Sequence, residues 1–178
     1  PGVRPSIFLA SVPTATAYTL ESDTGTNLAV TAGLSHTVTN LAPNALFGAR
    51  LRAANASGAG TFGPVVSLYT DPRPPTGTLV TNVTTATARA VWNANGNPAN
   101  TSYQVQISTR GDFASLSVAV SVSSTEAYVG GLLTGTSYFA RVKASGFGGS
   151  ASAFDATVAF VTNQFAAVSS TATPDTPY

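Results

Sequence analysis

The chain has no cysteine and no methionine, and charged residues are scarce. Without cysteine, its 178 residues can form no disulfide, no thiolate metal site and no cysteine nucleophile. Charged side chains make up 8% of the sequence, against about 25% in an average soluble domain, and the formal net charge is +1. Because so weakly charged a surface protects a free monomer poorly against self-association, the composition favours a secreted protein that works in an assembly.

The same scarcity argues against several kinds of partner. The eight lysines and arginines are scattered and nearly balanced by seven acids, so we expect no nucleic-acid partner. No segment is apolar for long enough to cross a bilayer, so we expect no membrane insertion. The chain begins at Pro1 without methionine or a charged leader. We interpret it as a processed or excerpted mature region of an extracellular or cell-surface protein.

Residues that could carry chemistry are few. His36 is the single histidine, and its alternation with Val38 in a predicted strand favours a packed structural side chain over a general base. The acids are isolated in sequence and form no calcium-loop or metal-ligand pattern. The glycine-rich residues 146–151 join two predicted strands and open no helix, which favours a flexible loop over a phosphate site. We therefore predict no catalytic residue, no metal and no cofactor.

Two segments of the sequence repeat without a gap. Residues 41–60, LAPNALFGARLRAANASGAG, align with residues 132–151, LLTGTSYFARVKASGFGGSA. The alignment pairs Phe47 with Tyr138 and matches ARLRA with ARVKA. Periods of this size usually indicate an array of domains, so we expect two small domains rather than one larger one.

Within each repeat, apolar residues alternate over short runs that are rich in Thr, Val, Tyr and Phe. Gly, Pro, Asn and Ser separate the runs, and no long segment has a helical period, so the pattern predicts strands. In the second repeat the predicted strands are residues 78–83, 86–93, 102–109, 115–121, 126–130, 137–145 and 157–162. Seven short strands indicate an immunoglobulin-like sandwich, so the predicted fold class is all-β.

Four stretches of the second repeat carry a family resemblance. ARAVW, SYQVQIS, VGGLLTGTSYFARVKA and VAFVT resemble the B, C, E-to-F and G strands of a fibronectin type III domain. Trp92 matches the core tryptophan of strand B, and Leu132 with Tyr138 matches the tyrosine corner. The resemblance covers residues 75–162 and implies two tandem fibronectin type III-like β-sandwiches. It says little about function, because this fold hosts many roles.

The first repeat departs from this pattern at its start. SVPTATAYTLES resembles the end of strand B, the following loop and strand C, so SIFLA takes the place of strand B, with Leu9 at the position of Trp92. Only PGVRP stands before it. We therefore predict an incomplete domain with strands B to G at residues 1–72, a complete domain at residues 73–163, and a tail at residues 164–178.

The tail, QFAAVSSTATPDTPY, has the rhythm of TLVTNVTTATARAVW at the start of the second domain. A sandwich without strand A has an apolar groove and an unpaired strand edge, which is a template for another chain. At roughly 3.3 Å per residue the tail spans about 50 Å at most, too little to pass its own second domain and fill its own groove. The predicted donor anchors are Phe165 and Val168, and the predicted groove residues are Ile7, Leu9, Val66 and Leu68. Head-to-tail donation of this kind builds a filament of identical subunits and resembles donor-strand complementation in pili.

Other interpretations stay open. If both ends are cuts from a longer array, the chain is a spacer or binding module of a secreted adhesin or carbohydrate-active enzyme. The tripeptide Arg110, Gly111 and Asp112 resembles integrin ligands, although these residues are also ordinary turn chemistry. Glycans are possible partners at three sequons, which begin at Asn55, Asn82 and Asn100.

Overall fold

The computed structural model describes residues 6–8 and 10–165, and all of their regular structure is β-strand. The first repeat contains β1 (Ser6–Phe8), β2 (Ala17–Ser22), β3 (Asn27–Thr31), β4 (Ser35–Thr37), β5 (Leu46–Asn55), β6 (Gly58–Ala59) and β7 (Val66–Tyr69). The second repeat contains β8 (Thr76–Thr81), β9 (Thr87–Asn93), β10 (Ser102–Ser108), β11 (Val118–Val122), β12 (Glu126–Gly130), β13 (Ser137–Ser145) and β14 (Val158–Val161). The all-β fold class is confirmed, and among the described residues no helix could span a membrane.

The second repeat is a sandwich of two antiparallel sheets, with strand orders β12-β9-β8 and β11-β10-β13-β14. Its strands lie within two residues of the predicted ranges, with β8 at Thr76–Thr81 rather than 78–83, except that β11 begins at Val118 rather than at residue 115. The reason is a local turn, in which the Ser108 hydroxyl donates to the Ser115 carbonyl and the Ser117 N–H donates to the Ile107 carbonyl. These contacts hold the preceding residues in a loop.

Alternating side chains of the second repeat fill one continuous core. The buried hydrophobic residues of this core are Ala88, Ala90, Trp92, Tyr103, Val105, Ile107, Ala127, Val129, Leu132, Tyr138, Ala140, Val142 and Ala144. The predicted tyrosine corner is present, because the Tyr138 hydroxyl accepts a hydrogen bond of 2.9 Å from the Leu133 N–H. The first strand, β8, packs against this core through Val80, which is half-buried.

The first repeat has the same two layers but a smaller core. β7 and β2 pair with opposite edges of β5, and β3 pairs with β2. The other layer contains β1 and β4 alone among the described residues, where the second repeat has three strands. Its core cluster of buried hydrophobic residues consists of Leu20, Val38 and Ala49. Within the part of the first repeat that the structure describes, no strand corresponds to β8.

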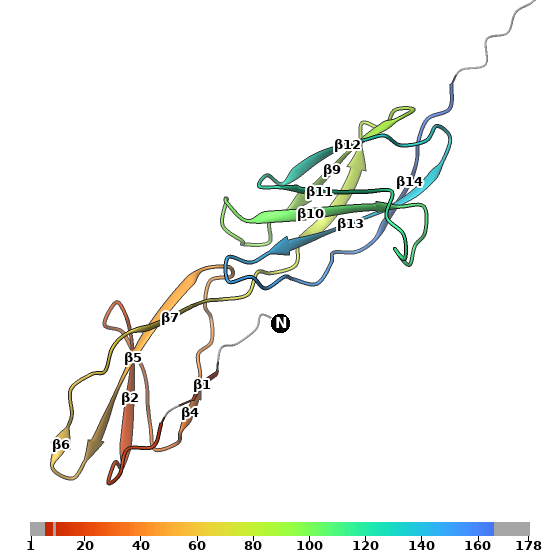
Figure 1. Cartoon of the computed structure of the whole chain (residues 1–178). Coiled ribbons are helices and arrows are strands. Elements are labelled where there is room, and N and C mark those ends of the chain that lie inside the picture. The colour runs from red at the N-terminus through yellow and green to blue at the C-terminus, as the bar shows by residue number, and fades with distance from the viewer. Residues whose placement is uncertain (1–5, 9, 166–178) are drawn as a thin grey trace, which may run out of the picture.

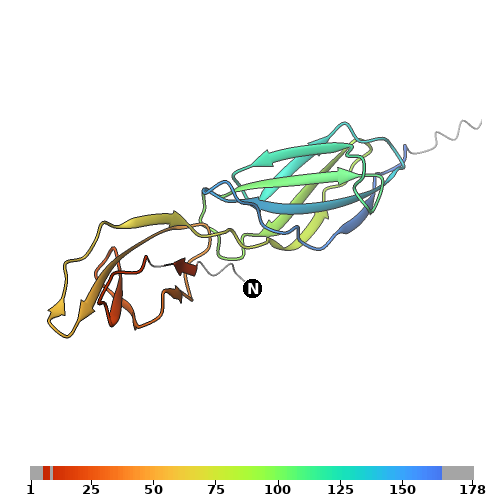
Figure 2. The ribbon, with the colours of Figure 1, turned by 60° about the horizontal axis from the view of Figure 1, so that its bottom comes forward.

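The repeats lie end to end, as Figures 1 and 2 show, and meet around Asn44. This side chain is fully buried; its amide nitrogen donates to the Thr101 hydroxyl at 2.8 Å, and its amide oxygen accepts from the Phe147 N–H at 2.7 Å. The rings of Tyr69 and Phe147 pack edge to face across the same joint, with centroids 5.8 Å apart. The glycine-rich loop that carries Phe147 thus contacts the first repeat.

Candidate strand-acceptor groove

An apolar groove of about 430 Å³ opens on the first repeat. Its lining residues are Ile7, Ala10, Leu20, Phe47, Ala49, Arg50, Leu51, Pro64, Val66 and Leu68. The structure therefore brings together Ile7, Val66 and Leu68, three of the four groove residues that the sequence predicts. The fourth, Leu9, lies outside the described residues.

The groove lies between the strands that β8 would join in a complete sandwich. In the second repeat, β8 pairs with β9 and also contacts β13 and β14. The corresponding strands of the first repeat are β1, β5 and β7, and these strands supply most of the groove lining. The groove is therefore the place that strand A occupies in the other repeat.

Two side chains of β7 are more exposed than their counterparts in the second repeat. Val66 and Leu68 are 69% and 38% exposed, whereas Val158 and Phe160 at the corresponding positions of β14 are half-buried. The register supports this correspondence, because Leu68 lies opposite Phe47 in the same way that Phe160 lies opposite Tyr138. Covering two aliphatic side chains of this size stabilises a sandwich by about 1.5 to 3 kcal/mol each when the burial is complete.

In the second repeat, a carboxylate holds the start of β8 in place. Asp155 accepts hydrogen bonds from the Thr78 N–H at 2.9 Å and from the Thr78 hydroxyl at 2.7 Å. Burial raises the pKa of Asp155, but these bonds and one from the Ala156 N–H outweigh burial, and the net pKa lies below its usual value. Gly63 precedes Val66 by three residues, as Asp155 precedes Val158, so the first repeat has no carboxylate at this position.

The segment after β14, which leads to the predicted donor residue Phe165, leaves the second repeat at the end that points away from the first repeat (Figure 1). Asn163 fixes that end, because its N–H donates to the Thr84 carbonyl and its side-chain amide donates to the Val83 carbonyl. Phe165 follows two residues later and is 76% exposed. The other predicted anchor, Val168, lies outside the described residues.

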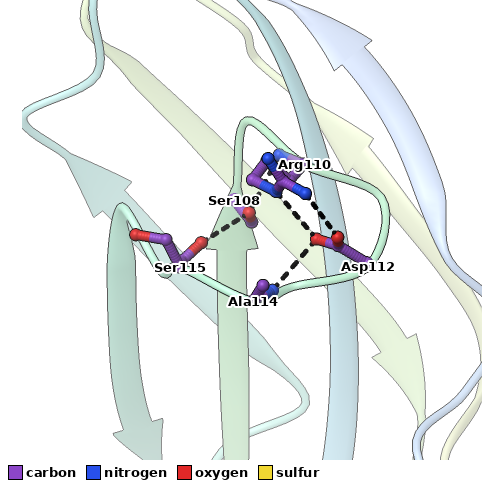
Figure 3. A network of polar contacts seen from close by, with 5 residues as sticks. All are labelled: Ser108, Arg110, Asp112, Ala114 and Ser115. Carbon is purple, nitrogen blue, oxygen red and sulfur yellow. Dashed lines mark hydrogen bonds and ion pairs between the residues drawn. The ribbon is translucent and has the colours of Figure 1, made fainter.

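The Arg-Gly-Asp tripeptide is a turn after β10 whose two charged side chains bind each other (Figure 3). Arg110 donates to both carboxylate oxygens of Asp112, at 3.1 and 2.7 Å, and the Ala114 N–H donates to the same carboxylate. The hydrogen bond from Arg110, followed by that from Ala114, lowers the pKa of Asp112 to about 2. Gly111 lies between them, against the ring of Phe139.

The remaining polar candidates have structural surroundings. His36 is half-buried in β4 and lies opposite Ile7 of β1. Glu21 forms an ion pair with Arg50 at 3.2 Å, and Glu126 pairs with Arg89. Within the described residues, no group of three or more histidine, aspartate or glutamate side chains could hold a metal ion. The three sequon asparagines are exposed on the surface, at Asn55, Asn82 and Asn100.

Seven of the ten groove-lining residues were not named as groove residues by the sequence analysis, and two of these are large hydrophobic residues on neighbouring strands. Phe47 and Leu20 line the groove from β5 and β2. The pairing of Phe47 with Tyr138 in the repeat alignment was a usable signal, because the tyrosine is buried in the complete repeat. The sequence could not show that the phenylalanine at this position is only partly covered.

Comparison with known proteins finds one domain family that matches the second repeat. Residues 73–158 match the sequence profile of the fibronectin type III domain, whose members are typically binding or structural modules. No curated protein matches the chain.

Solved structures give weaker likenesses. The FN1–FN3 domains of chicken CNTN1 are 18% identical with a TM-score of 0.47, and the match covers 83% of this chain and 56% of that one. The chain thus spans about half the length of that structure. A myokine is 18% identical with a TM-score of 0.46, covering 53% of this chain and 100% of that one. A computationally redesigned β-sandwich protein is 24% identical with a TM-score of 0.44, covering 53% and 93%.

Proposed function

With residues 73–158 matching the fibronectin type III domain, we propose that the chain is the structural subunit of an extracellular or cell-surface filament. Each subunit donates the segment that begins at Gln164 to the groove of the next subunit's first repeat. The donated segment takes the place of strand A beside β1. Assembly is therefore head to tail, and its partners are identical copies of this chain.

One observation carries this proposal: the layer that has three strands in the second repeat has two among the described residues of the first, and an apolar groove lies beside them. An unpaired strand edge beside exposed apolar side chains is a strong template for an added strand. The low charge of the chain supports the same interpretation, because few like charges oppose close packing of copies.

The position of Phe165 supports donation to another molecule rather than to its own groove. Asn163 is hydrogen-bonded at the far end of the second repeat. Two residues of extended chain reach about 7 Å, so Phe165 cannot reach its own first repeat while these bonds hold. The contact between subunits is therefore heterologous, and repetition of it gives an open filament when the rotation does not close a ring.

The test separates the donor from the acceptor. A chain that ends at Asn163 should not form filaments, and its first repeat should melt at a lower temperature than in the parent. A synthetic peptide of residues 164–178 should bind this chain and restore the melting transition of the first repeat. A peptide with Phe165→Asp is the matched control and should bind at least about tenfold more weakly, because a buried charge replaces a buried ring.

Two outcomes would contradict the proposal. In one, the shortened chain still polymerises like the parent. In the other, its first repeat keeps the parent's stability and the peptide does not bind. A monodisperse parent chain in sedimentation velocity, with no filaments in electron micrographs, would favour the spacer module instead. The second repeat, which contains all its strands, provides an internal reference for folding in each measurement.

A further inference from the structure

The second repeat contains a template for the register of the donated strand. In β8, Val80 lies opposite Ala90 of β9, and Leu79 lies opposite Val91. Val80 packs against the core, whereas Leu79 is 59% exposed on the outer face. Any strand that replaces β8 in the first repeat must present its apolar side chain at the Val80 position, because a slip of one residue turns that side chain outward.

The residue of the first repeat that corresponds to Ala90 is Ile7. Ala90 lies opposite Ala127, and Ile7 lies opposite His36. Ala127 and His36 each stand five residues before the paired leucines of the repeat, Leu132 and Leu41. β1 and β9 are therefore in the same register with their neighbours, and Ile7 lines the groove as Ala90 lines the core.

The apolar residues of the donor segment match those of β8 and the following loop in one alignment. Val80 and Val83 are the apolar residues at the start of the second repeat that pack against its core, and Phe165 and Val168 have the same spacing of three. We propose, resting on the function proposed above, that Phe165 lies opposite Ile7 of the next subunit, in the position that Val80 has opposite Ala90. Gln164 then falls on the exposed Leu79 position, where a polar side chain meets water.

Side-chain volumes support this register. In the second repeat, Tyr138 stacks on Phe160 with centroids 5.6 Å apart, and Val80 packs against the same core. In the first repeat, Leu68 replaces Phe160, which removes a ring from the site. A larger donor side chain at the valine position compensates for that loss, since cores conserve total volume better than single identities.

Val168, the second predicted donor anchor, fixes the register less firmly than Phe165. Between Val80 and Val83, Asn82 has a φ of 48°, which is left-handed backbone. Ala167 falls on that position, and alanine tolerates left-handed backbone less well than asparagine. The register is therefore assigned through Phe165.

Disulfide trapping measures the register directly, because the chain contains no other cysteine. One double variant combines Phe8→Cys with Gln164→Cys, the pair that corresponds to Val91 and Leu79. The control combines Ser6→Cys with Gln164→Cys, which tests a register shifted by two residues along the same strand. Filaments of each variant are oxidised and run on a non-reducing gel. The 8–164 pair should give a covalent ladder about tenfold stronger than the 6–164 pair, because diagonal partners lie beyond disulfide reach.

The results distinguish the proposed register from strand donation as such. A ladder from the 6–164 pair alone overturns the register and leaves strand donation standing. Filaments without a ladder from either pair overturn the register, and the peptide of residues 164–178 described above then decides whether donation itself stands. If the double variants do not form filaments, mixing single Phe8→Cys and Gln164→Cys chains gives the same decision, since donation yields a covalent dimer in the correct register and its absence contradicts the proposal.

Discussion

Replacing Asn44 with glycine should uncouple the two repeats. The backbone at Asn44 has a φ of 49°, which glycine adopts without strain, so Asn44→Gly removes the side chain alone. Gly135 shows that this substitution is compatible with the fold, because it holds the corresponding corner of the second repeat with a φ of 60°. What the variant loses are the hydrogen bonds to Thr101 and Phe147 at the joint.

The expected cost follows from these two bonds. Each contributes about 0.5 to 1.5 kcal/mol, and a buried partner left without a hydrogen bond costs about 1 to 3 kcal/mol. Thr101 is fully buried, while Phe147 lies in an exposed loop where water can replace the lost acceptor. The joint should therefore lose about 2 to 3 kcal/mol. Asn44→Ala should cost about 1 kcal/mol more, since alanine also strains the left-handed backbone.

Calorimetry and hydrogen exchange measure this effect. In the parent chain the Phe147 amide should exchange slowly and the first repeat should gain stability from the second. In Asn44→Gly that amide should exchange faster and the first repeat should melt earlier. Asn40→Gly is the matched control, because Asn40 is exposed and also has a positive φ, of 61°. If the two variants behave alike, the buried amide does not hold the joint.

Three further predictions concern single contacts. Tyr138→Phe should cost the second repeat about 1 kcal/mol in thermal unfolding by removing the bond to the Leu133 N–H, and an unchanged melt would contradict the tyrosine corner. Because the folded pKa of Asp155 is depressed, its contribution is present above the unfolded value of 3.8 and is lost as the pH falls through the folded value. In Asp155→Asn, the free energy of unfolding should fall less steeply as the pH is lowered than in the parent. The same steepness in both chains would contradict a stabilising role for the Asp155 carboxylate. Asp112→Glu should change stability by less than about 0.5 kcal/mol and leave cell attachment unchanged, and a selective loss of adhesion would identify a receptor motif.

Sequence patterns predicted the second repeat well because its strands alternate strictly and its turns carry Gly, Asn and Pro. Alternation is a local property, so counting along the chain was sufficient. The same comparison of aligned positions in the two repeats predicted Ile7, Val66 and Leu68 as groove residues, since the repeats share a register. The start of β11 was predicted three residues early, because alternation cannot show that the Ser108 hydroxyl caps the preceding loop.

Long-range polar contacts could not be predicted in this way. Asn44 stands in an ordinary turn sequence, and its partners Thr101 and Phe147 lie 57 and 103 residues further along the chain. No periodic pattern connects such positions. The pairing of Arg110 with Asp112 also depends on the turn geometry, which places two side chains of opposite charge on the same side of the loop.

In the proposed filament, the donor segment fills the groove of another molecule because it is attached at the far end of its own chain. Attached next to its own groove, the same segment should fill that groove instead. A chain that carries residues 164–178 before Pro1, joined by a short Gly/Ser linker, contains the same residues with the donation made internal. Sedimentation velocity and electron microscopy should then find a stable monomer with two folded repeats and no filaments. If this rearranged chain polymerises like the parent, another surface drives assembly and the groove is not the acceptor.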